Sequence, residues 1–109
     1  MERKMKALLV SMVMLTLAGA PALADAAAGK VVFDKACRAC HGAAGQGNPG
    51  MAKIMKVEMR HLGSKEVQAK SDAELKKAIT DGTGKMKPVP SVTGTRADDV
   101  VAFVRTLKQ

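Results

Sequence analysis

The sequence predicts an all-α protein, and three observations support that prediction. Apolar residues recur at helical spacing in several segments, and no segment shows the apolar–polar alternation of a half-buried strand. From Asp25 onward the chain is short and has only two aromatic rings, Phe33 and Phe103. So short a chain buries a limited part of its surface, so its own side chains should form only a small hydrophobic core. Such a domain needs an additional stabilising group, such as a cross-link or a bound cofactor.

The first 24 residues are typical of a secretory signal peptide. A basic start is followed by an apolar run and by the small-residue ending Ala22-Leu23-Ala24. An uncleaved membrane anchor is the alternative, but the run is short for a bilayer span of ~20 residues and contains Gly19 and Pro21. We therefore predict cleavage after Ala24, export to the periplasm, and one domain over residues 25–109.

The first helix of that domain is predicted over residues 26–40. Val32, Phe33 and Ala36 fall on one side of it, and charged residues fall on the other. Residues 42–50 are rich in glycine and predict a loop.

A second helix is a candidate over residues 51–61, because Met51, Met55 and Met59 recur every fourth residue. These methionines could form a soft-metal face, but a methionine stripe at this spacing more often packs against a core. His61 ends the segment and is the only histidine outside the motif described below.

Two further helices are predicted towards the C-terminus. Ser71 and Glu74 form a capping-box pattern at the start of a helix that ends near Asp81-Gly82. Thr95 and Asp98 form a similar pattern before an apolar stripe that extends to Leu107.

The segment CRACH, Cys37 to His41, is the strongest chemical signal in the chain. Cys-x-x-Cys-His is the attachment signature of c-type haem: two thiols add to the haem vinyl groups, and the histidine ligates the iron. Residues at i and i+3 lie on one side of a helical turn, so Cys37 and Cys40 can reach neighbouring edges of one porphyrin. A haem would also supply the large apolar body that the thin core lacks.

Other chemistries fit this motif less well. A thioredoxin-type redox pair needs a βαβ context, which the pattern does not show. A structural zinc site needs four ligands, and only His61 is left to join Cys37, Cys40 and His41. A disulfide between cysteines this close would close only a small loop and stabilise the fold little.

The segment GTGKMKPVP, Gly82 to Pro90, predicts a shaped loop around Met86. Glycine permits backbone angles that other residues avoid, and proline restricts them. A methionine held in such a segment has a neutral, polarizable sulfur in a defined place.

Together these residues resemble the class I c-type cytochromes, small exported single-haem electron carriers of the bacterial type, over residues 26–109. The resemblance rests on the CRACH motif, on Gly29 and Phe33 before it, and on the glycine–methionine loop. It implies a small cytochrome c fold, with about four helices wrapped around one covalently bound haem c. It also implies that Gly29 and Phe33 pack against an aromatic of the last helix, here Phe103.

The resemblance also implies the haem ligands. Cys37 and Cys40 would form the thioether bonds, and His41 and Met86 would be the axial iron ligands. The family motif commonly places proline directly after the methionine, whereas Lys87 stands there in this chain. That insertion affects the shape of the loop more than the identity of the ligand. His61 remains an alternative sixth ligand.

One-electron transfer without catalysis is the function that this ligand set implies, because two axial ligands leave no open position on the iron. A haem peroxidase or gas-binding sensor with a displaceable sixth ligand is one alternative, and an electron-entry subunit of a larger complex is another. Fifteen basic and nine acidic residues from Asp25 onward give a net charge of +6. We expect redox partners with acidic docking surfaces, a monomer, no nucleic-acid partner and no stable membrane insertion after cleavage.

Overall fold

A computed structural model describes residues 24–109, and six helices and no β-strand occur in this part of the chain. The helices are α1 (Ala26–Ala36), α2 (Arg38–His41), α3 (Pro49–Met55), α4 (Lys65–Gln68), α5 (Asp72–Asp81) and α6 (Gly94–Arg105). The all-α prediction is thus confirmed. The predicted signal peptide lies, apart from Ala24, outside the described residues.

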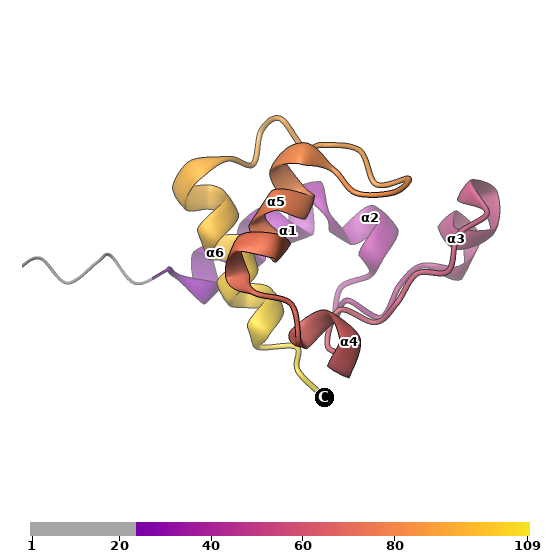
Figure 1. Cartoon of the computed structure of the whole chain (residues 1–109), viewed down its shortest axis with the longest axis horizontal. Coiled ribbons are helices and arrows are strands. Elements are labelled where there is room, and N and C mark those ends of the chain that lie inside the picture. The colour runs from indigo at the N-terminus through magenta and orange to yellow at the C-terminus, as the bar shows by residue number, and fades with distance from the viewer. Residues whose placement is uncertain (1–23) are drawn as a thin grey trace, which may run out of the picture.

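Helices α1 and α6 pack against each other, with α5 beside α6. Figure 1 shows this group of three, with α3 at the far end of the molecule and α4 near the C-terminus. Phe33 of α1 and Phe103 of α6 are in aromatic contact, their ring centroids 5.0 Å apart at an interplanar angle of 55°. Gly29 lies where the α1 backbone meets the Asp99 carbonyl of α6, so the predicted packing of Gly29 and Phe33 on the last helix is confirmed.

The first helix is shorter than predicted. We expected it to run through residue 40, but α1 ends at Ala36 and a separate turn, α2, follows. Cys37 stands between them with φ −123° and ψ −28°, outside helical geometry. The break between the two helices thus falls on the first cysteine of the CRACH motif.

The predicted helix over residues 51–61 is correct only for its first half. Lys56 adopts a left-handed conformation, with φ 56° and ψ 50°, and ends α3. The Val57 N–H then donates to the Ala52 carbonyl at 3.0 Å, a backbone bond that closes helix ends of this kind. Met59 therefore lies in an irregular segment beyond the helix.

Helix α5 begins as predicted. The Ser71 hydroxyl accepts from the Glu74 N–H, and the Glu74 carboxylate accepts from the Ser71 N–H, each at 3.1 Å. Helix α6 begins at Gly94 after Thr93, so Thr95 lies inside the helix and does not cap it as predicted. The short helix α4, capped by Ser64, was not predicted.

Arg105 ties these C-terminal elements together. Its guanidinium donates to the carbonyls of Gln68 at 3.0 Å and Lys70 at 2.6 Å, and to the Asp72 carboxylate at 2.8 Å. The segment between α4 and α5 is thereby attached to α6. None of the helices in residues 24–109 has the length and hydropathy to cross a bilayer.

Candidate functional site

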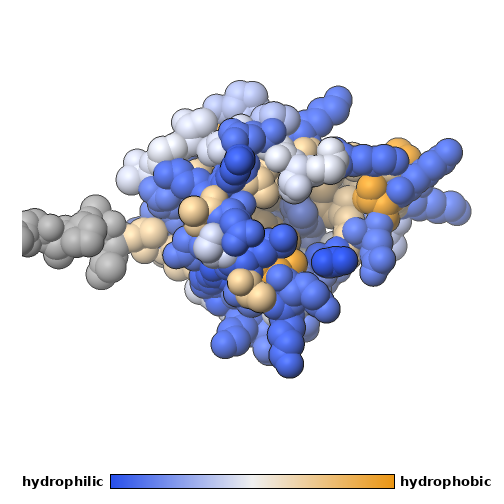
Figure 2. Space-filling view, in the orientation of Figure 1, coloured by the Kyte–Doolittle hydropathy of each residue, from blue (hydrophilic) through white to orange (hydrophobic). Residues whose placement is uncertain are grey.

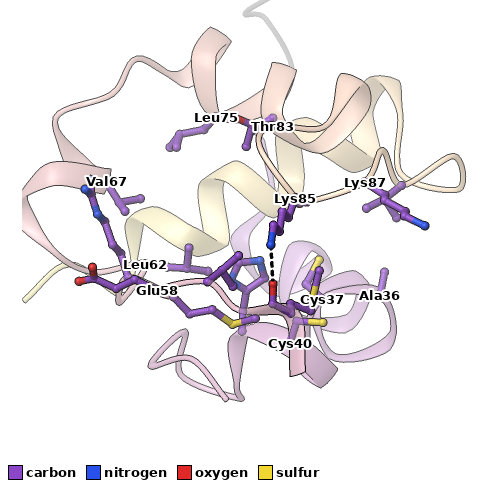
Figure 3. A pocket seen from close by; sticks show the side chains of 18 of the residues that line it. Ala36, Cys37, Cys40, Glu58, Leu62, Val67, Leu75, Thr83, Lys85 and Lys87 are labelled. Carbon is purple, nitrogen blue, oxygen red and sulfur yellow. Dashed lines mark hydrogen bonds between the residues drawn. The ribbon is translucent and has the colours of Figure 1, made fainter. Parts of the chain in front are cut away.

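A cavity of about 730 Å³ lies between α2, α5 and the loops at residues 57–62 and 83–89. Ligand pockets generally enclose roughly 300–1,000 Å³, so this cavity is large enough for a sizeable cofactor. Its walls are mainly aliphatic and methionine side chains. Figure 3 shows Leu62, Val67 and Leu75 away from the side of the cavity where Cys37 and Cys40 lie.

The CRACH motif provides one wall of this cavity. Cys37, Cys40 and His41 all line it, and both cysteines are free thiols. Burial, with a smaller contribution from the neighbouring Cys40, raises the pKa of the Cys37 thiol to about 11. A thiol–disulfide exchange site needs a thiol whose pKa is lowered towards neutral pH. Cys37 therefore lacks the electrostatic setting of a thioredoxin-type nucleophile.

His41 has the electronic state that a metal ligand requires. Burial lowers its pKa, so the imidazole is neutral at neutral pH. Its Nδ1 atom is buried without a hydrogen-bond partner among the described residues. A neutral imidazole that lines a cavity is a good ligand for iron.

Met86 reaches the same cavity from the loop after α5. Thr83 and Met86 exchange two backbone hydrogen bonds of 2.9 Å, and Gly84, at φ 55°, starts the turn between them. Gly82 has φ 82°, and a Cβ atom there would lie 2.6 Å from the Met86 carbonyl oxygen. The glycines are thus required by the conformation that carries Met86.

Two contacts anchor this loop to the rest of the molecule. The Val89 N–H donates to the Ile79 carbonyl of α5 at 3.0 Å. On the other side, the Lys85 ammonium donates to the Met55 carbonyl at the end of α3 at 2.9 Å, the bond drawn in Figure 3. Lys87, which departs from the family motif, lies beside Met86 on the cavity wall.

The other candidate ligands occupy different places. Met55 and Met59 line the cavity with Met86, whereas Met51 is half-buried and is not part of its wall. His61 is also outside the wall, and its Nδ1 accepts a hydrogen bond from the Gly63 N–H at 2.9 Å. Within residues 24–109, no three histidine, cysteine or acidic side chains come together as a metal site would require.

Several cavity residues were not singled out from the sequence. Leu62, Val67 and Val89 are apolar residues of loops or of the unpredicted helix α4. Leu75 lies in the helix that the Ser71–Glu74 capping box predicted, and helical spacing was the one signal available for it. Basic residues also stand on the wall: Arg60, Lys70, Lys85 and Lys87, with Glu58 as the acidic residue there.

Comparison with known proteins places the chain among haem proteins. Residues 26–108 match the family model described as Cytochrome c. The chain is 33% identical over 89 residues to cytochrome c-554(547) of Halothiobacillus neapolitanus, covering 77% of this chain and 98% of that protein. Its fold is similar to the solved structure of the KustC0563 c-type cytochrome, with a TM-score of 0.63 and 25% identity. That match covers 74% of this chain and 98% of the other.

The cavity fits the covalently bound haem c of such proteins. Its volume and apolar walls suit a porphyrin, and both free thiols lie at one wall. The imidazole of His41 lies beside them, and its buried Nδ1 has no hydrogen-bond partner among the described residues. Met86 adds a soft thioether donor to the same cavity. The basic side chains of the wall could neutralise carboxylates of a bound cofactor.

Proposed function

Because the chain belongs to the cytochrome c family, whose members carry covalently bound haem c and are generally electron carriers, we propose that it is an exported one-electron carrier. The haem supplies the one-electron chemistry through the ferric and ferrous states of its iron. In this proposal Cys37 and Cys40 hold the haem through thioether bonds. His41 and Met86 would be the two protein ligands of its iron.

One observation carries the proposal: Met86 lines the same cavity as the CRACH motif although the two are far apart in the sequence. The Thr83–Met86 backbone pair and the attachment of Val89 to α5 restrict the loop before any ligand binds. A preorganised loop needs little rearrangement when the iron changes its charge, which favours fast electron transfer. Two protein ligands on the iron would leave no position for a substrate, so we propose transfer rather than catalysis.

Substitution of Met86 tests the ligand assignment. A thioether ligand raises the reduction potential, so Met86→Ala should lower it, on the order of tenths of a volt within the ~0.8 V range that axial ligands set. It should also let carbon monoxide bind the reduced protein readily. Met86→His should restore a sixth iron ligand and give a low reduction potential. This variant keeps the test possible if the alanine variant folds poorly.

Met55→Leu and Met59→Leu are the matched controls, since both methionines line the cavity without being proposed ligands. Visible spectra, redox titration and carbon monoxide binding of the purified haem protein provide the measurements. The assignment is wrong if Met86→Ala keeps the native spectrum while a control or His61→Ala loses it. Prompt carbon monoxide binding by the unmodified protein would instead favour a gas sensor or peroxidase.

We also propose that the chain is exported to the periplasm with cleavage after Ala24, and that it acts as a monomer. Bacterial c-type cytochromes are typically exported, which supports the location, and the predicted signal peptide agrees with it. Redox proteins are the expected partners in this family. Mass spectrometry of the purified protein tests cleavage, because it should start at Asp25 and carry one haem. Co-purification with other subunits would indicate a larger complex.

A further inference from the structure

The backbone nitrogen of Asp25 connects the start of α1 to α6. It donates a hydrogen bond to the Asp99 carboxylate of α6 at 2.8 Å, across 74 positions of the sequence. Asp25 is also the N-cap of α1, and its own carboxylate accepts from the N–H groups of Ala27 at 2.9 Å and Ala28 at 3.2 Å. Asp25 therefore begins the helix with its side chain and holds it to α6 with its backbone.

This nitrogen is the one that the proposed cleavage after Ala24 would release. Hydrolysis of the Ala24–Asp25 peptide bond consumes one water, leaves a carboxylate on Ala24 of the signal peptide and leaves an amino group on Asp25. At neutral pH an α-amino group is mostly protonated, so the neutral amide N–H would become an ammonium group. A donor that already lies 2.8 Å from a carboxylate would thus gain a positive charge.

The charges near Asp25 favour Asp99 as the partner of such an ammonium group. Ala24, the residue before it, lines a surface hollow whose charged side chains already form two ion pairs, Lys76–Asp98 at 2.9 Å and Arg105–Asp72 at 2.8 Å. On α1, Lys30 is paired with Asp34. Asp99 takes part in no ion pair within residues 24–109, so its carboxylate is available to the ammonium group.

The position of this site limits the strength of the pair. Asp25 is exposed and Asp99 is half-buried. Figure 2 shows hydrophilic side chains close to the start of the described chain, at the left of the view, so water would partly screen the two charges. A positive charge at the start of a helix also opposes the helix dipole, and the carboxylates of Asp25 and Asp99 would offset that effect.

We propose that cleavage after Ala24 creates an ion pair between the terminal ammonium group of Asp25 and the Asp99 carboxylate, so that removal of the signal peptide strengthens the contact between α1 and α6. This inference rests on the cleavage proposed above and does not depend on the electron-carrier role. The pair would hold the first turn of α1, the helix that ends beside Cys37, against the last helix of the domain.

A double-mutant cycle on the haem-loaded protein tests the pair. The first change inserts Ser-Gly between Ala24 and Asp25, so that Asp25 keeps an amide and the ammonium group moves up to roughly 7 Å along the chain. The second change is Asp99→Asn, which removes the charge and keeps an oxygen acceptor. Each change alone should lower the melting temperature by roughly 2–5 °C, as expected for one partly exposed ion pair in a domain of this size. Together they should lower it by about as much as either change alone.

Asp98→Asn is the matched control for the charge on α6. Asp98 precedes Asp99 in the same helix and pairs with Lys76, so the substitution removes an equal charge that does not contact the Asp25 nitrogen. Its effect on the melting temperature should be the same with and without the insertion. In about 1 M sodium chloride the effect of the insertion should become smaller, because salt screens a partly exposed pair.

Additive effects of the insertion and Asp99→Asn would overturn the inference, because they would show that Asp99 only accepts a hydrogen bond from the backbone. Equal melting temperatures for the processed chain and the inserted chain would overturn it as well. Mass spectrometry distinguishes these results from a failure of the cleavage proposal: a processed chain that starts at a residue other than Asp25 refutes the cleavage, and this inference with it. The electron-carrier proposal is tested separately by the Met86 variants.

Discussion

Gly29→Ala should destabilise the protein, because the backbone of α1 at Gly29 lies directly against the backbone of α6 at Asp99. A Cβ atom at this position would lie 1.9 Å from the Asp99 carbonyl oxygen and 2.4 Å from its carbon. Ordinary contacts of this kind are about 3.4–4 Å. The α6 backbone would therefore have to move away by more than 1 Å. That movement would also open the contact between Phe33 and Phe103.

The change in the free energy of unfolding is the sum of an overpacking cost and a smaller gain in helix propensity. Overpacking of a core generally costs about 1–3 kcal/mol, and the upper end applies here because the obstacle is backbone rather than a flexible side chain. Alanine recovers about 1 kcal/mol relative to glycine through helix propensity. The net loss is then about 2 kcal/mol, which for a domain of this size lowers the melting temperature by roughly 8–16 °C.

Thermal unfolding of the haem-loaded protein, followed by far-ultraviolet circular dichroism, measures this loss. Gly50→Ala is the control within α3, since its Cβ would meet only the Asn48 side-chain oxygen, at 3.3 Å. We expect a change of less than about 1 kcal/mol there. An unchanged or raised melting temperature for Gly29→Ala would refute the close approach of α1 and α6.

Two further predictions concern the C-terminal half. Arg105→Ala should lower the free energy of unfolding in urea by about 1–3 kcal/mol, because the carbonyls of Gln68 and Lys70 lose a charged donor. Asp72→Asn should cost less, since the Asp72 side chain is 77% exposed; equal losses would show that the ion pair dominates. Hydrogen bonds from the backbone and the hydroxyl of Ser71 hold the pKa of Glu74 below its usual range. The stability that this carboxylate contributes is therefore present at neutral pH and is lost as the pH falls through its folded-state pKa. Urea unfolding measured at a series of acidic pH values should show this loss for the unmodified protein and not for Glu74→Gln.

Much of the fold could be predicted because the signals are local. The Ser71–Glu74 capping box begins α5, and Gly29, Phe33 and Phe103 pack as their spacing and family resemblance implied. Each of these features depends on residues three or four positions apart or on one pair of helix faces. The boundaries were less accurate. The left-handed conformation of Lys56 ended α3 early, and non-glycine residues adopt it too rarely for the pattern to indicate it.

The CRACH motif predicted a covalently bound haem from the sequence alone, because attachment to haem requires particular residue types at short spacing, whereas the role of Met86 as an iron ligand stays a prediction. Only the tertiary structure decided that Met86 and His41 share one cavity, and that His61 instead bonds to Gly63. It likewise decided that Ile54 is exposed beside that cavity while Met55 lines it. These arrangements depend on contacts between segments that are distant in the sequence. The paths of the irregular loops decide which of those segments meet, and residue spacing carries no information about these paths.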